Sequence, residues 1–171
     1  MAVAIRPLAP EDLGAYKALR DAMLAAHADA FTSDAATEGA RPAHHYLSRL
    51  GLDRPEGGHF MLGAFSGTEL VGAVSCERDP RIKVRHLAHM TAMMVRDDLH
   101  GRGIGRALLA ASIERARAAD GLERLTINVT STNTRALQLY EYGGFRRYGR
   151  LEHAIKVDGS YHHKDHLVLV L

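Results

Sequence analysis

Residues 86–116 constrain the possible folds of this chain more than any other segment. The run 86–95 is apolar at both alternating sets of positions, which is typical of a central strand covered on both faces. Three glycines at alternate positions, Gly101, Gly103 and Gly105, then lead into a helix. The apolar stripe of that helix consists of Ile104, Leu108, Leu109, Ile113 and Ala116. A buried strand joined by a glycine loop to an amphipathic helix requires a sheet packed against helices.

The rest of the chain supplies further strands and helices around this unit. Apolar runs predict strands at 2–8, 59–66, 69–78, 124–130, 145–157 and 163–171. Helical spacing and end signals predict helices at 10–27, 41–50 and 134–142, and a helix from Ile104 that Gly121 ends. Turns at 67–68 and 158–159 predict two hairpins. The order β-α-α-β-β-β-α-β-α-β-β predicts a single mixed α/β domain over residues 1–171.

The composition excludes several classes of protein. A net charge of +2 over 171 residues is too small for a nucleic-acid-binding domain. No apolar run approaches the roughly 20 residues of a membrane helix, and the first residues lack the layout of a secretion signal. The single cysteine, Cys76, cannot form an internal disulfide, and its place in an expected strand indicates a small buried side chain. We therefore expect a cytoplasmic protein with no nucleic-acid or membrane partner.

The glycine loop has the composition of an anion-binding site. A helix N-terminus offers unpaired N–H groups and a partial positive charge, and glycine lets a phosphate approach the backbone closely. Arg102 and Arg106 add positive charge nearby. Neither the Walker pattern nor the dinucleotide pattern is matched, because Arg106, Ala107 and Leu108 occupy the required positions. The loop therefore fits a pyrophosphate of another kind, or it is only a turn that lets the helix pack.

A second motif, one helix and one strand later, favours the binding interpretation. Residues 133–145, NTRALQLYEYGGF, carry the spaced set Asn133, Ala136, Leu139, Tyr140, Gly144 and Phe145. Together with Gly103 and Gly105, this motif resembles the GNAT superfamily of N-acetyltransferases, which use acetyl-coenzyme A. The resemblance extends over residues 85–146. It implies the GNAT fold, a mixed and mostly antiparallel sheet of about seven strands with helices on both faces.

Two residues depart from the family pattern. His100 stands where the family has Arg or Gln, and Asp97 replaces a common proline. Phosphate contacts in this loop are expected from backbone N–H groups, so neither change should abolish cofactor binding. Asp97 and Asp98 place negative charge near the anion site, which weakens cofactor binding unless both carboxylates point to solvent.

The resemblance also implies the cofactor site and the acid. The implied cofactor-binding residues are Met94, Val95, His100, Gly101, Arg102, Gly103, Ile104, Gly105, Arg106, Asn128, Asn133, Ala136 and Tyr140. Backbone N–H groups near Met94 and Val95 would polarise the thioester carbonyl. Tyr140 would protonate the leaving thiolate, because a phenol with a pKa of about 10 keeps its proton at pH 7. It shares one helix face with Asn133 and Ala136. The amine would attack directly, without an acyl-enzyme.

The sequence leaves the general base open. His89 shares a strand face with Met93 and Val95 if the strand is regular, and an ordinary histidine pKa near 6.5 suits proton uptake. The alternative is a structural histidine, and His86 is a weaker candidate. A weak or absent base favours an α-amine, whose neutralisation at pH 7 costs about 1 kcal/mol, against roughly 4–5 kcal/mol for a lysine-like amine.

The acceptor is the least defined part. In the family it binds between the first two helices and the last hairpin, which makes Phe31, Glu38, His89 and Tyr161 the substrate-binding candidates. The final segment, 154–171, resembles members that act on amino acids, polyamines or related small amines. The alternatives are a protein or peptide acceptor, a longer acyl donor, and a non-catalytic domain that senses acetyl-coenzyme A. We expect no metal site, because no histidine cluster has ligand spacing, and the last hairpin offers an edge for a homodimer.

Overall fold

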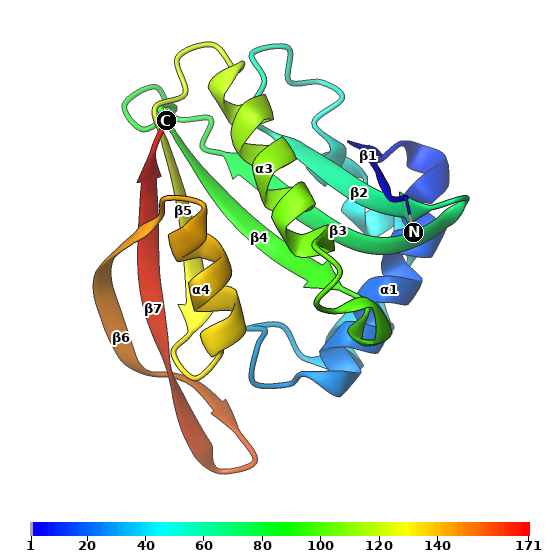
Figure 1. Cartoon of the computed structure of the whole chain (residues 1–171), viewed down its shortest axis with the longest axis vertical. Coiled ribbons are helices and arrows are strands. Elements are labelled where there is room, and N and C mark those ends of the chain that lie inside the picture. Colours follow the sequence, from blue (N-terminus) through cyan, green and yellow to red (C-terminus); the bar gives the residue numbers. More distant parts are fainter. Residues whose placement is uncertain (1) are drawn as a thin grey trace.

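The computed structural model describes residues 2–171 and contains one seven-stranded sheet (Figure 1). The strands are β1 (Ala4–Pro7), β2 (Phe60–Ser66), β3 (Glu69–Arg78), β4 (Leu87–Val95), β5 (Arg124–Thr130), β6 (Arg146–Val157) and β7 (Ser160–Val170). Their order in the sheet is β1-β2-β3-β4-β5-β7-β6. Every neighbouring pair is antiparallel except β4 and β5, which are parallel. The predicted mixed, mostly antiparallel sheet is confirmed.

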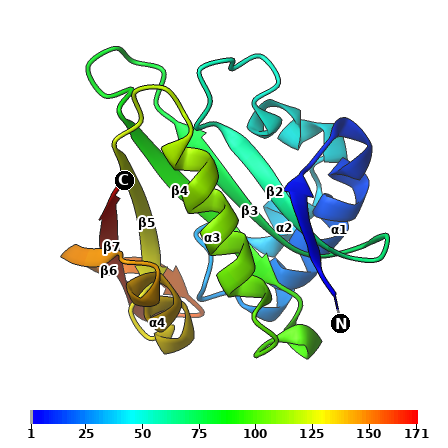
Figure 2. The same cartoon turned by 45° about the horizontal axis from the view of Figure 1, so that its top comes forward.

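Helices cover both faces of the sheet, as predicted. The α-helices are α1 (Leu13–Ala26), α2 (Ala35–Gly39), α3 (Ile104–Arg117) and α4 (Thr134–Tyr142), and the 3-10 helices are η1 (Pro10–Asp12), η2 (Ala43–Leu50) and η3 (Asp97–Leu99). In Figure 2, α3 crosses one face while α1 and α2 lie behind the other. Side chains of β3 alternate between two cores, with Val74 beneath α3 and Ala73 beneath α1. None of the helices in residues 2–171 has the length and apolar character that a membrane crossing requires.

The N-terminal helices follow local signals, with one addition. The buried side of α1 is the predicted stripe of Leu13, Tyr16, Leu19 and Met23. The helix expected at 41–50 is the 3-10 helix η2, which ends at Gly51 with a φ of 67°. The short α2 was not predicted, although Asp34 gives it a regular N-cap by accepting a hydrogen bond from the Thr37 N–H (2.8 Å).

The strand β4 is interrupted by a bulge at Ala92. This alanine has a φ of 52°, and the register with β3 shifts between Ala73 and Ser75. Before the bulge, Met90 packs beneath α3, and after it Met94 packs beneath α1. In a regular strand, residues four apart lie on the same face, so the bulge exchanges the two faces of β4.

The bulge corrects the predicted orientation of His89. Val95 packs on the α3 side, beyond the bulge, whereas His89 precedes the bulge and alternates with Met90. The prediction that His89 and Val95 share a strand face was therefore wrong. His89 lies on the α1 side of the sheet, on the same side as Met94.

Beyond His89, β4 and β5 separate. The parallel pairing covers only Leu87–His89 on β4 and Arg124–Thr126 on β5. Figure 1 shows the two strands diverging from this point, with α4 beside the opening. The end of β4 thus has no partner on the β5 side.

The final hairpin places polar side chains beside this opening. Its turn at Asp158 and Gly159 has positive φ angles of 48° and 82°, as the predicted two-residue turn requires. Across β5 and β7, Thr130 is paired with Lys164 and Asn128 with His166. Directly paired residues share a sheet face, and this face is the α1 side.

Candidate functional site

The glycine loop forms one end of a groove of about 730 Å³ between α3, α4 and the end of β4. Gly101 and Gly103 have φ angles of 78° and 80°, which L side chains rarely adopt, and a Cβ on either would meet no protein atom within 4 Å. The first hydrogen bond of α3 runs from the Ala107 N–H to the Gly103 carbonyl (3.0 Å). The N–H groups of residues 104–106 have no partner in the helix, and they stand at the positive end of its dipole.

Most of the expected cofactor residues line this groove. They are Met94, Val95, His100, Gly101, Gly103, Ile104, Gly105, Arg106, Asn133, Ala136 and Tyr140. Arg102 does not line it, and Asn128 lines a second cavity instead. Arg135 lines the groove although the sequence motif did not single it out.

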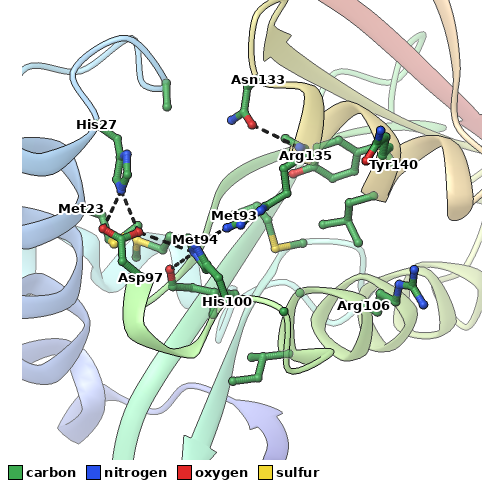
Figure 3. A pocket seen from close by; sticks show the side chains of 18 of the residues that line it. Met23, His27, Met93, Met94, Asp97, His100, Arg106, Asn133, Arg135 and Tyr140 are labelled. Carbon is green, nitrogen blue, oxygen red and sulfur yellow. Dashed lines mark hydrogen bonds and ion pairs between the residues drawn. The ribbon is translucent and has the colours of Figure 1, made fainter.

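A row of polar side chains crosses the mouth of the groove (Figure 3). The His27 Nε2, at the end of α1, lies 2.8 Å from the Asp97 carboxylate. The His100 Nε2–H donates to the Val95 carbonyl (2.8 Å), and its Nδ1 accepts from Arg135. The carboxylate of Asp97 thus has a histidine partner. The other acid of this loop pairs with an arginine, because Arg96 lies 2.6 Å from Asp98. The negative charge that the sequence placed beside the loop is therefore partly compensated.

Tyr140 lines the groove from α4. Its helix begins at Asn133, whose side chain caps it by accepting from the Ala136 N–H (3.2 Å). Asn133, Ala136 and Tyr140 all line the groove, as expected for one helix face. Tyr140 is only 3% exposed and packs edge-on against Phe145. Burial raises the pKa of its hydroxyl, so the phenol holds its proton at neutral pH.

A second, smaller cavity of about 170 Å³ adjoins the groove on the α1 side of the sheet. The two spaces share the wall residues Ala30, Phe31, Met93, Asn133, Ala136 and Tyr140. His89 lies in the small cavity, where its Nδ1 is 2.8 Å from Thr126 Oγ1. Burial lowers the pKa of His89, although Glu77 opposes this effect. The ring is therefore mainly neutral at pH 7.

Two expected acceptor residues lie elsewhere. Glu38 is buried in an ion pair with Arg20 (3.1 Å) and accepts a hydrogen bond from the Tyr46 hydroxyl (2.7 Å). Tyr161 lies near the tip of the last hairpin, half exposed, with its ring 4.6 Å from that of His153. Neither residue lines the groove or the small cavity, whereas Phe31 lines both.

The structure adds two basic residues to the site. Arg135 in the first turn of α4 had a usable signal, because it lies two residues after the motif Asn133. Lys164 lines the small cavity through its pairing with Thr130. Its position depends on the order of strands in the sheet, which no local pattern around residue 164 reports.

Known proteins resemble this chain in sequence and in fold. The model of the acetyltransferase (GNAT) family matches residues 20–145. Mycothiol acetyltransferase of Salinispora tropica is 30% identical over 128 residues, which are 75% of this chain and 41% of that protein. The chain therefore spans less than half the length of this curated relative.

Solved structures support the fold. The GNAT-family acetyltransferase of Streptococcus pneumoniae superposes with a TM-score of 0.85 at 24% identity, covering 99% of this chain and 100% of that one. The yncA protein of Salmonella typhimurium, solved with its cofactor acetyl-CoA, superposes with a TM-score of 0.85 at 19% identity, covering 100% of this chain and 95% of that one.

Proposed function

The chain belongs to the GNAT acetyltransferase family, and we propose that it transfers the acetyl group of acetyl-coenzyme A to a primary amine of a small molecule. The observation that carries the proposal is the position of Tyr140 in the wall shared by the groove and the small cavity. A donor in the groove and an amine in the cavity would meet beside one phenol. In this proposal the whole chain acts as one catalytic domain.

The groove fits the pyrophosphate of coenzyme A. Gly101 and Gly103 leave open space where side chains would stand, and the free N–H groups of residues 104–106 suit phosphate oxygens. Arg106 and Arg135 add positive charge at the same end. When bound, the cofactor supplies an acetyl group activated as a thioester.

The end of β4 is the proposed electrophilic element. Because β4 leaves β5 after His89, the backbone around Met94 and Val95 has no strand partner on that side. Backbone N–H groups held rigidly beside a developing oxyanion stabilise negative charge. We assign this role to the N–H groups near Met94 and Val95.

Proton transfers are assigned to two side chains. The Tyr140 hydroxyl, protonated at neutral pH, would give its proton to the leaving sulfur. His89 is the proposed base. When its Nδ1–H donates to Thr126 Oγ1, the Nε2 lone pair is free to accept a proton from the amine. Direct attack is supported by Cys76, which is fully buried with its pKa raised to about 12 and is therefore no nucleophile at pH 7.

The proposal includes a homodimer through the sheet edge. β6 is the outer strand and carries exposed Tyr148 and Leu151, and unpaired edges readily join a second strand. Light scattering after gel filtration should give the mass of a dimer. The mass of a monomer at all protein concentrations would refute the proposed homodimer.

The function is tested by mass spectrometry of products formed from acetyl-coenzyme A and a panel of amines. Tyr140→Phe is compared with Tyr142→Phe, because Tyr142 lies on the same helix but is 71% exposed. We expect a monoacetylated small amine, with kcat reduced at least 10-fold in Tyr140→Phe and unchanged in Tyr142→Phe.

Other outcomes identify the alternatives. An unchanged kcat in Tyr140→Phe would show that the phenol is not the general acid, while the proposed acetyltransferase activity would stand. Acetylation confined to peptides would indicate a protein acceptor. Tight binding of acetyl-coenzyme A without any product would indicate a sensor, and faster turnover of a longer acyl thioester would change the donor.

A further inference from the structure

The small cavity contains basic side chains and no acidic ones. Of the eighteen residues that line it, none is Asp or Glu, and three are basic: Arg20, His89 and Lys164. The remaining polar lining consists of hydroxyl and amide side chains, which add no charge. The charge inside the cavity therefore depends on the protonation and ion pairing of these three residues.

Two of the three basic residues carry no uncompensated charge. The Arg20 guanidinium is paired with Glu38 at 3.1 Å, and both side chains are almost fully buried. His89 is mainly neutral at pH 7, because burial disfavours its charged form. The acid whose charge acts on His89 is Glu77, which lies opposite it on β3 and does not line the cavity.

Lys164 is the unpaired cation of this cavity. Its Nζ donates one hydrogen bond, to Thr32 Oγ1 at 2.9 Å, and forms no ion pair with any carboxylate in residues 2–171. An ammonium has three N–H donors, so two remain for another partner. A partly buried ammonium without a counter-ion is unfavourable, and a bound anion would remove this penalty.

These observations select among the small amines. A polyamine would bring a further positive charge beside the Lys164 ammonium, which disfavours binding. A neutral amine would leave the ammonium without a counter-ion. We infer that the acceptor is an amino acid, whose carboxylate is bound by Lys164 and Thr32 while its amine faces the wall at Tyr140. This inference rests on the proposed function and makes Lys164 its specificity-determining residue.

The size of the cavity agrees with this assignment. Its volume of about 170 Å³ is less than a quarter of that of the groove, at about 730 Å³. Amine and carboxylate must therefore lie close together, as they do in an α-amino acid. Phe31 and Met93 provide apolar surface beside them.

The test compares each of the twenty common L-amino acids with its carboxamide and its decarboxylated amine, and includes spermidine. kcat and KM are measured for the wild type and for Lys164→Met, which keeps the length of the side chain but removes its charge. Lys164→Arg restores the charge. Lys156→Met is the control, because Lys156 is an exposed lysine of the same hairpin.

We expect kcat/KM of the wild type to be at least 10-fold higher for the preferred amino acid than for its carboxamide. In Lys164→Met the KM for the amino acid should rise about 10- to 100-fold, while values for the carboxamide stay within about 2-fold. Lys164→Arg should retain a clear preference for the acid, and Lys156→Met should match the wild type.

Failure of the inference and failure of the proposed function give different results. The role of Lys164 is overturned if carboxamides or spermidine are turned over as fast as amino acids, or if Lys164→Met lowers kcat/KM equally for all substrates. Either result leaves the proposed acetyltransferase activity standing. Absence of any acetylated amine in the wild type, with acetyl-coenzyme A bound, overturns the proposed function and this inference together.

Discussion

Replacing Gly103 by alanine separates the folding role of the glycine loop from its binding role. Gly103 has a φ of 80°, and an added Cβ would meet no protein atom within 4 Å. The cost to folding is therefore backbone strain alone, about 1–2 kcal/mol, partly offset by the reduced entropy of the unfolded chain. Gly159 in the last hairpin is a matched control, because its φ is 82°, its surroundings are equally open, and it lies outside the groove.

Both variants should lose about 1 kcal/mol of unfolding free energy in urea, followed by far-UV circular dichroism because the chain has no tryptophan. Coenzyme A affinity, measured by calorimetry, should fall only in Gly103→Ala. The Cβ would stand beside the free N–H groups of residues 104–106, and losing one or two hydrogen bonds to a charged group raises Kd about 10- to 100-fold. Equal affinity in Gly103→Ala and Gly159→Ala would refute a phosphate-binding role of the loop.

Two further predictions concern buried polar groups. Glu38→Gln should lower the unfolding free energy by about 3–5 kcal/mol, because it leaves the Arg20 charge buried without a partner. Tyr46→Phe, which removes only the hydrogen bond to Glu38, should lower the unfolding free energy by about 2 kcal/mol. A larger loss in Tyr46→Phe than in Glu38→Gln, measured by urea titration, would contradict a stabilising role of the ion pair. Because burial lowers the folded pKa of His89, the unfolded chain takes up more protons than the folded one as the pH drops below about 6.5, so stability falls on acidification from pH 7. His89→Gln should lessen that fall, and an unchanged pH dependence would mean that His89 is not buried in its neutral form.

The sequence was sufficient where local patterns decide the structure. The run 86–95, the alternate glycines and the apolar stripe of α3 each follow from periodicity, and the structure has the strand, loop and helix where these predict them. The helix expected at 134–142 is α4, and in the structure the Asn133 side chain caps its start. Most groove-lining residues come from these two segments, so most of the expected cofactor residues do line the groove.

The acceptor side depends on tertiary contacts and was predicted less well. Glu38 was expected near the acceptor, but Arg20 and Tyr46 hold it in the core. Tyr161 was expected there because of its hairpin, but it lies near the hairpin turn and does not line the small cavity. Lys164 was missed because its position depends on the pairing of β7 with β5, which are separated in sequence by α4 and β6.

The bulge at Ala92 lies where the groove and the small cavity adjoin. The positive φ of Ala92 costs about 1–2 kcal/mol, because Ala92 is not a glycine. The residues around Ala92 in the sequence do not predict this conformation. The bulge exchanges the strand faces, and it follows the point at which β4 leaves β5, because the pairing of these two strands ends at His89. His89 then lies in the cavity on one side and Val95 in the groove on the other, while Met93 and Tyr140 lie between them. The strained alanine thus lines the small cavity beside the opening across which the proposed acetyl transfer would occur.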